Sequence, residues 1–286
     1  MKTIRELAGR RKPARGFTLI EAVLVIALTG IVAAMVGVFI RQPINAYVDQ
    51  ARRAELSDTA DTALRRVARD LSRALPNSVR VDPSGLLLEF LPVSASGRYR
   101  AAPAADGSGD YLDFDNPADS SFAVLGPPVD TASGDQLVVY NLGLPGADAY
   151  SGETRRALTS IGTALGSLGY SVGASQFPYP SPGNRFQIVG TPVTYACEPA
   201  ANGAGVLRRF AGYAIQSAQP LDPAAAPLAA LIGRNNSVLA DKVAGCSFAF
   251  SSGASARTGL VTLRLTVASG GESMTLLHQA HIDNSP

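Results

Sequence analysis

The sequence predicts an α+β protein in which one long N-terminal helix packs under a mostly antiparallel β-sheet domain. Three observations predict this fold. Residues 22–40 form an uncharged apolar run, a stripe of apolar residues at helical spacing continues to residue 75, and the rest of the chain alternates short β-type segments with turns. We expect four segments: a basic leader at 1–16, an apolar helix at 17–40, its amphipathic continuation at 41–75 and an exported β-rich domain at 76–286.

Composition and charge exclude two classes of protein. Hydrophobic residues make up 46% of the chain and charged residues 17%, which is a globular and not a disordered composition. The net charge of +2 hides an imbalance, because residues 1–16 are strongly basic and the rest of the chain is slightly acidic. A nucleic-acid partner is therefore not expected.

The apolar run is long enough to cross a membrane, because residues 22–40 would span about 28 Å as a helix. The basic leader should then stay in the cytoplasm while the C-terminal mass is exported. A cleaved signal peptide would need a shorter run followed by a small-x-small site, whereas Arg41-Gln42-Pro43 follows here. A plain signal anchor explains the length but not Glu21, since an acid inside a spanning segment is costly.

The start of the run, Gly16-Phe17-Thr18-Leu19-Ile20-Glu21, follows a basic leader and precedes the long apolar helix. This arrangement resembles the prepilin processing motif of type IV pilins and type II secretion pseudopilins. The resemblance implies that a prepilin peptidase cuts after Gly16, that Phe17 is then N-methylated, and that Glu21 becomes the fifth residue of the mature chain. It also implies a single-pass inner-membrane subunit with a periplasmic C-terminal domain, which joins other major and minor pilins in a filament of a Gram-negative bacterium.

The resemblance gives Glu21 a role in assembly. Cleavage after Gly16 creates a charged α-amine at the membrane face, and Glu21 of a neighbouring subunit can pair with it where an isolated charge is expensive. Such pairing would set the axial register of the packed helices. The alternative is that Glu21 is an acid that snorkels to the membrane interface.

The helix is expected to continue past the membrane as an amphipathic segment. Pro43 should kink or locally break it, and Pro76 should end it. Asp61 and Arg65 can pair at i,i+4 on the solvated side. The apolar residues of the buried side recur at steps of three and four: Leu56, Ala60, Ala63, Leu64, Val67, Leu71 and Leu75.

The exported domain should consist of antiparallel strands. A hairpin is expected at 78–81 and 86–91, and another at 259–268 and 273–282, each closed by a short turn. Further strands are expected at 136–141, 185–189, 193–197 and 206–215. The polar connections at 93–135, 143–184 and 216–236 are expected to be surface loops or small excursions, with no clear domain linker.

Four segments of the exported domain extend the resemblance. They are Ala74–Arg80, Arg185–Cys197, Val243–Phe248 and the tail His278–Asn284. They resemble minor pilins of the mannose-sensitive haemagglutinin (MSHA) pilus system, of the MshO type. This resemblance implies a minor subunit with a disulfide late in the domain. The alternatives are a J-type minor pseudopilin of type II secretion and an adhesin displayed on the filament.

The two cysteines, Cys197 and Cys246, both lie beyond the apolar run. If this part is exported, a disulfide between them is the natural interpretation. Closing a loop of about 50 residues would stabilise the fold by roughly 4 kcal/mol. The alternative is a pair of buried free thiols.

Motifs for catalysis are lacking in the sequence. The two histidines, His278 and His281, are three residues apart on a predicted strand and should point to opposite faces, which makes a poor metal pair. There is no nucleophile elbow, Walker A motif or zinc-ligand spacing. We therefore expect no catalytic residues and no enzyme activity, an anchored periplasmic enzyme being the alternative.

One acidic cluster could hold a cofactor. Asp106, Asp110, Asp113 and Asp115 could supply oxygen ligands for calcium, and some pseudopilins bind this ion. Their spacing does not match an EF-hand loop, and acidic glycine-rich loops are usually only solvated. Calcium at these residues is thus a weak expectation, and no other metal or cofactor is expected.

Overall fold

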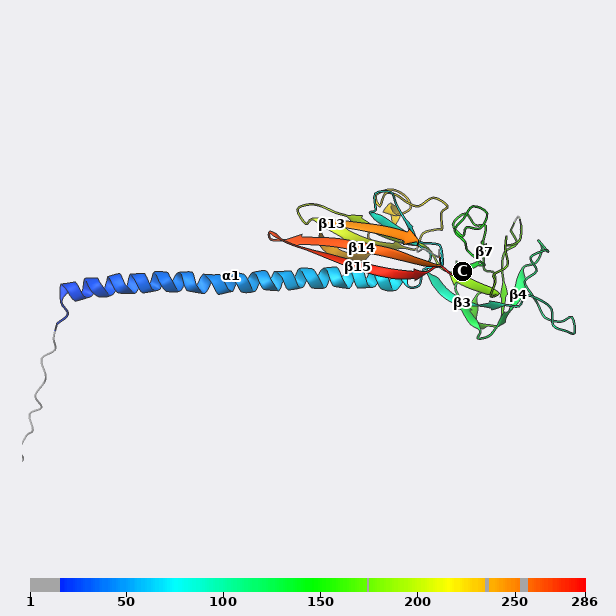
Figure 1. Cartoon of the computed structure of the whole chain (residues 1–286), viewed down its shortest axis with the longest axis horizontal. Helices are drawn as coiled ribbons and strands as arrows, with labels where there is room; N and C mark the ends of the chain where they lie inside the picture. Colours follow the sequence, from blue (N-terminus) through cyan, green and yellow to red (C-terminus); the bar gives the residue numbers. More distant parts are fainter. Residues whose placement is uncertain (1–15, 174, 235–236, 253–256) are drawn as a thin grey trace, which may run out of the picture. The chain divides into compact units, whose positions relative to one another are not determined.

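The computed structural model describes residues 16–173, 175–234, 237–252 and 257–286. The chain divides into two compact units, Met1–Ala51 and Arg52–Pro286. One helix, α1 (Leu19–Leu71), begins in the first unit and ends in the second, and the strands follow it (Figure 1). The other elements are β1 (Arg80–Val81), β2 (Leu87–Phe90), β3 (Val93–Tyr99), β4 (Ser121–Leu125), β5 (Val129–Thr131), β6 (Gln136–Val138), β7 (Arg155–Ala157), β8 (Gly162–Leu165), β9 (Ser167–Gly169), β10 (Arg185–Val189), β11 (Val193–Glu198), β12 (Gly205–Ala211), the 3-10 helix η1 (Ala229–Leu231), β13 (Ser237–Ser252), β14 (Thr258–Ser269) and β15 (Glu272–Asp283).

Helix α1 corrects two expectations about its course. It is helical through Pro43, so the local break expected there is wrong. A proline removes one backbone hydrogen bond, and the bonds on both sides maintain the helix. The helix also ends at Leu71 and not at Leu75, because the backbone N–H of Leu75 donates to the carbonyl of Leu91 at 2.7 Å and thereby joins the β-sheet region.

The second unit contains a seven-stranded antiparallel sheet in the order β1-β2-β11-β12-β13-β14-β15. The C-terminal part of α1 packs against it with the predicted stripe. Every residue of that stripe is at most 2% exposed, which confirms the helical periodicity read from the sequence. The strand side of this core comes from β2, β11, β12, β13, β14 and β15, with Tyr195, Leu263 and Leu265 fully enclosed.

Polar contacts fix the helix on the sheet at Asp70. Its carboxylate accepts hydrogen bonds from the Tyr195 hydroxyl at 2.7 Å and from Arg209 Nε at 2.8 Å, and Arg66 lies 3.3 Å away. Burial raises the pKa of Asp70, but the hydrogen bonds from Tyr195 and Arg209 outweigh burial and leave the pKa below its usual value.

Replacing Asp70 with asparagine should therefore destabilise the protein in a pH-dependent way. A carboxylate with a lowered folded-state pKa stabilises the fold above the unfolded pKa of about 3.9, and this contribution disappears as the pH falls through the folded value. We expect Asp70→Asn to lower the free energy of unfolding by about 2 kcal/mol at pH 7.

Urea unfolding of the full chain in nonionic detergent checks this prediction. The difference between wild type and Asp70→Asn should narrow at pH 3. Asp61→Asn is the matched control on the same helix, since its pair with Arg65 is solvent-exposed and its loss should leave the free energy of unfolding nearly unchanged. A difference that stays constant with pH would contradict the role of the Asp70 charge.

The predicted loops at 93–135 and 143–184 are wrong in large part. Residues 93–135 contain strands β3, β4 and β5. Residues 143–184 contain strands β7, β8 and β9. With β6 and β10 these build a six-stranded sheet in the order β7-β6-β10-β3-β4-β9 and a two-stranded sheet β5-β8. The third connection, 216–236, holds only η1 among its described residues. The missed strands are short and rich in Ser, Gly and Ala, so their sequences show little β-type alternation.

The six-stranded sheet has a core of its own, made largely of aromatic residues. Tyr99, Phe122, Tyr170, Phe177 and Phe186 form successive ring contacts with centroids 5.3 to 6.2 Å apart. A separate cluster joins this sheet to the end of the helix and includes Leu75, Leu91, Val138, Tyr150 and Val189. The two sheets therefore have separate hydrophobic cores, and a smaller cluster links them.

Three asparagines hold the chain where helix, second sheet and C-terminus meet. The side-chain amide of Asn77 donates to the carbonyls of Asn141 and Asn284, and the Asn141 amide donates to the carbonyl of Pro76 at 2.7 Å. Asn77 has a φ of 59°, in the left-handed region that asparagine tolerates better than most residues.

The predicted disulfide is confirmed, because Cys197 of β11 is bonded to Cys246 of β13. Strand β12 lies between these two strands in the sheet. At its first residue, Gly205, a side chain would collide with the carbonyls of Val243 and Glu198. The disulfide therefore ties β11 to β13 close to the point where the intervening strand begins.

Candidate processing and assembly site

The residues predicted for processing lie at the start of α1. Thr18 caps the helix, because its hydroxyl oxygen accepts a hydrogen bond from the backbone N–H of Glu21 at 3.3 Å. Gly16 and Phe17 precede the helix, and the Phe17 side chain is 74% exposed. A side chain built on Gly16 would meet no atom within 4 Å. No described residue therefore blocks the approach of another protein to the Gly16–Phe17 peptide bond.

Glu21 occupies the third position of the helix, where an acid interacts favourably with the helix dipole. The spacing Thr18-x-x-Glu21 is that of a capping box, a local signal that the sequence contains in addition to the processing motif. The Glu21 side chain is exposed, and it has no hydrogen bond or ion pair to any residue that the structure describes. It is therefore available to a group on another molecule.

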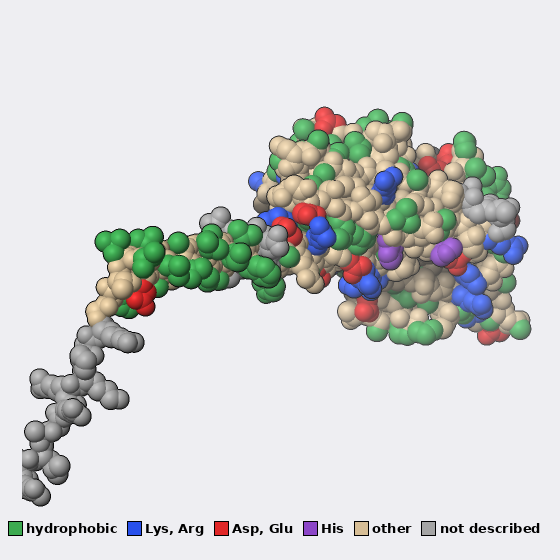
Figure 2. All heavy atoms as spheres, turned by 60° about the vertical axis from the view of Figure 1, so that its left-hand side comes forward, with side chains coloured by type: hydrophobic (Ala, Val, Ile, Leu, Met, Phe, Trp, Pro, Cys, Tyr) green, Lys and Arg blue, Asp and Glu red, His purple; other side chains and the backbone are tan. Residues whose placement is uncertain are grey.

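The helix that follows has the length and composition of a membrane anchor. Leu19–Phe39 has a mean hydropathy of 2.7, and none of its most apolar window is buried. The one hydroxyl in the middle of this segment, on Thr29, donates to the carbonyl of Val25 at 2.7 Å and so stays within the helix. Apolar side chains cover the visible surface of this segment (Figure 2). A continuous apolar surface of this size needs lipid or other helices to cover it.

The calcium candidates lie in the connection between β3 and β4, where their carboxylates hold local turns. Asp106 Oδ1 accepts hydrogen bonds from the backbone N–H and the hydroxyl of Ser108, which lower the pKa of Asp106. Asp113 Oδ1 accepts the backbone N–H of Asp115 at 3.0 Å. Across the described ranges, no three His, Cys, Asp or Glu side chains are grouped so as to hold a metal ion. Calcium binding stays a prediction without structural support.

The histidines lie as expected on β15, His278 partly buried and His281 exposed on the opposite face. The processing residues, the calcium candidates and the histidines thus lie on different elements, and no described contact connects them.

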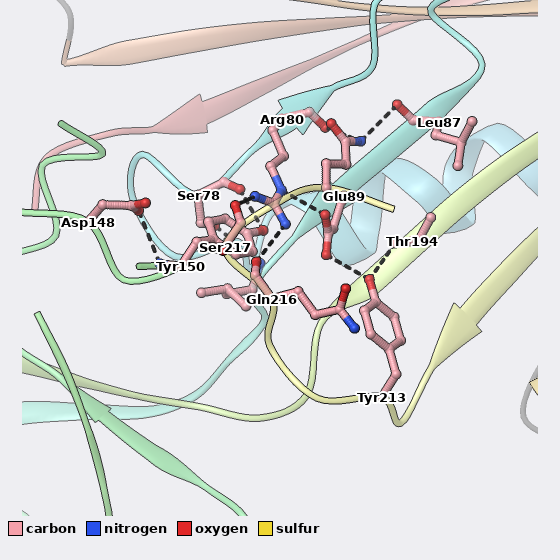
Figure 3. Close-up of polar contacts among 12 residues, drawn as sticks. Ser78, Arg80, Leu87, Glu89, Asp148, Tyr150, Thr194, Tyr213, Gln216 and Ser217 are labelled. Carbon is pink, nitrogen blue, oxygen red and sulfur yellow. Dashed lines mark hydrogen bonds and ion pairs between the residues drawn. The ribbon is translucent and has the colours of Figure 1, made fainter. Parts of the chain in front are cut away.

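A buried polar cluster in the second unit was not predicted. Glu89 of β2 is fully buried and accepts hydrogen bonds from Arg80 Nε and from the Tyr213 hydroxyl, both at 2.7 Å (Figure 3). The Arg80 guanidinium also donates to the carbonyls of Gln216 and Ser217. The predicted hairpin at 78–81 and 86–91 pairs the strands of Arg80 and Glu89, but no local pattern indicates that Tyr213 and the 216–217 connection join them.

The cluster extends to Tyr150 beside the second sheet. The Arg80 guanidinium lies 3.6 Å from the Tyr150 ring centroid, and the Tyr150 hydroxyl donates to the Ser78 carbonyl at 3.0 Å (Figure 3). Burial and the nearby Glu89 charge raise the pKa of Tyr150 well above its usual value, so the phenol stays protonated. All of these groups are engaged with one another, which suits a structural cluster and not a reactive one.

Comparison with protein families identifies one motif. The family model for the prokaryotic N-terminal methylation motif matches residues 11–37, which include the end of the leader, Gly16 to Glu21 and most of the apolar helix. Neither a curated protein nor a solved structure matches the chain. The motif implies cleavage by prepilin peptidase and assembly with other pilins. The chain therefore carries the N-terminal methylation motif that indicates a type IV pilin or pseudopilin-type precursor, with the apolar helix as its candidate membrane anchor.

Proposed function

We propose that this protein is a minor pilin or pseudopilin, a non-catalytic structural subunit of a type IV pilus-like filament that acts in its assembly or initiation. The observation that carries the proposal is the methylation motif at 11–37, which leads into an apolar helix with an entirely exposed surface. The non-catalytic role is supported by the lack of a catalytic motif in the sequence.

In this proposal, prepilin peptidase cuts after Gly16 and Phe17 is N-methylated. The new amine then lies four residues before Glu21, at the membrane face. When the helices of neighbouring subunits pack together, Glu21 of one subunit neutralises the Phe17 amine of another, and this pairing sets their axial register. The free carboxylate of Glu21 and the open Gly16–Phe17 bond support these steps.

The subtype that we propose is a minor pilin of the MSHA type. Three of the four segments that resemble it lie mostly in strands β10, β11, β13 and β15, whereas Ala74–Arg80 is the turn between α1 and β1. A J-type minor pseudopilin would share the same anchor and processing. In the tip subunits of such filaments the fifth-position acid is often missing, so Glu21 favours a position below the tip.

The proposed location is the inner membrane of a Gram-negative bacterium, with the second unit in the periplasm before assembly. The basic leader supports this orientation, because positive charge is retained on the cytoplasmic side. The Cys197–Cys246 disulfide supports it independently, because disulfides persist in oxidising compartments.

Mass spectrometry of the protein from its native membrane tests the proposal. We expect a chain that begins at N-methylated Phe17. A chain that still begins at Met1, in cells with an active prepilin peptidase, would contradict it. Co-purification then separates the subtypes, since an MSHA-type subunit should be recovered with pilus subunits and a J-type subunit with other pseudopilins.

A further inference from the structure

We propose that the six-stranded sheet binds a carboxylated sugar, a uronate residue of an acidic polysaccharide, in a groove between Arg98 and Arg185. The groove has a volume of about 380 Å³ and lies over β3 and β10, with Ser96 and Gln187 also lining it. It is not part of the processing site, and the proposal does not depend on the filament role.

The arginines form an unfavourable pair. Arg98 of β3 and Arg185 of β10 are direct partners in the antiparallel register, and both are exposed. Directly opposite side chains have Cβ atoms about 5 Å apart, where like charges destabilise a sheet. Within the described part of the chain, neither guanidinium has a hydrogen bond or a carboxylate within 4.0 Å, so each presents its N–H donors to the groove or to solvent.

Other arginines of the same unit have hydrogen-bond partners within the fold. Arg80 binds Glu89 and two carbonyls, and Arg209 binds Asp70. Arg98 and Arg185 have no such contacts, and two adjacent positive charges without a counter-charge attract an anion. A carboxylate fits between them, because a guanidinium binds both oxygens of a carboxylate in a planar fork.

The floor of the groove adds a second requirement. Gln187 is only 8% exposed, and its buried Oε1 has no hydrogen-bond partner among the described residues. Gln187 lies directly opposite Ser96 and two residues from Arg185, so the amide and the arginines share one face of the sheet. The Oε1 atom is closed to solvent, so a turn of the Gln187 side chain towards the groove would let this oxygen accept a hydrogen bond from a donor beside the carboxylate. A hydroxyl satisfies this requirement, since it can donate to an amide oxygen.

These two requirements, together with an apolar neighbour, favour a uronate over other anions. Leu125 of β4 is the other cross-strand partner of Arg98 and is 42% exposed, so a hydrophobic surface adjoins the charged pair. A uronate combines a carboxylate, adjacent hydroxyls and a ring with an apolar face. Sulfate and phosphate ions have no apolar face, and an acidic peptide has no ring that presents a carboxylate, a hydroxyl and an apolar face together.

Binding of trigalacturonate to the full chain in nonionic detergent micelles tests the proposal by calorimetry. The fully methyl-esterified trisaccharide is the matched ligand without charge, and we expect it to bind at least tenfold more weakly. Arg98→Gln should weaken trigalacturonate binding at least tenfold, and Gln187→Leu should weaken it without changing the charge of the site. Arg264→Gln, at an exposed arginine of β14 in the other sheet, should leave binding unchanged.

Thermal unfolding shows whether the variants are folded, and Arg98→Gln should unfold at an equal or higher temperature because it removes a like-charge contact. The proposal is overturned if trigalacturonate does not bind, if the acid and its ester bind equally, or if Arg98→Gln has no effect. An equal loss in Arg264→Gln would show nonspecific attraction. Competition by sulfate or by a glutamate peptide at the same concentration would overturn the assignment to a sugar.

Discussion

Replacing Gly16 with valine should leave the protein at its full 286-residue length and prevent its assembly into a filament. The expected effect is near-complete loss of the form that begins at Phe17. A side chain at position 16 meets no atom of the chain within 4 Å, so the fold itself has no reason to change. The loss would come from the added β-branched side chain at the bond that the peptidase must bind.

Intact mass of the membrane-bound protein measures this effect directly. Gly9→Val is the matched control, because it makes the same change in the leader seven residues from the bond to be cut. We expect the control to be processed like wild type. Recovery of a chain beginning at Phe17 from the Gly16→Val strain would disprove cleavage after Gly16.

Replacing Arg80 with methionine should cause the largest loss of stability, about 3–5 kcal/mol. Glu89 is fully buried, and the substitution removes the only cation paired with it in the described structure. A buried carboxylate left without its counter-charge keeps the full cost of its desolvation. The substitution also removes the donors to two carbonyls of the 216–217 connection.

Denaturant unfolding of the full chain measures this loss, and a second substitution separates its causes. Adding Glu89→Gln to Arg80→Met removes the unpaired charge and should recover part of the stability. Arg65→Met removes an arginine from an exposed pair and should leave the free energy of unfolding nearly unchanged. A similar loss in Arg65→Met and Arg80→Met would contradict the importance of burial.

The sequence predicts elements well where one local period dominates. The stripe from Leu56 to Leu71 repeats at helical steps, and the β14–β15 hairpin alternates around Gly270 and Gly271, so both were predicted within a few residues. It predicts β13 and β3 poorly. Strand β13 has an irregular register near Val243, and β3 reads Val-Ser-Ala-Ser-Gly-Arg-Tyr, where small residues obscure the alternation.

The candidate sites differ in the same way, because some are encoded by a local pattern and others depend on distant pairing. Gly16, Phe17 and Glu21 form a continuous motif, and their mutual positions follow from a single helix start. The Arg80–Glu89 pair and the opposed Arg98 and Arg185 depend on which strands pair and in which register. The pairing of β1 with β2 follows from a predicted hairpin, whereas β3 and β10 lie far apart in the sequence and their register is decided by burial across the whole sheet.

The order of the strands has a consequence for how the protein is made. Ion pairs join Arg53 of α1 to Glu272, and Glu55 to Lys242, so the helix is bound by strands synthesised about two hundred residues later. The apolar stripe near residues 56–71 is completely covered only once β13, β14 and β15 have left the ribosome, because these strands supply part of its core. Contacts this distant in sequence form slowly. A nascent chain of this protein therefore exposes part of the apolar helix surface for most of its translation, and truncation before residue 237 would remove β13, β14 and β15 from the strands that cover it.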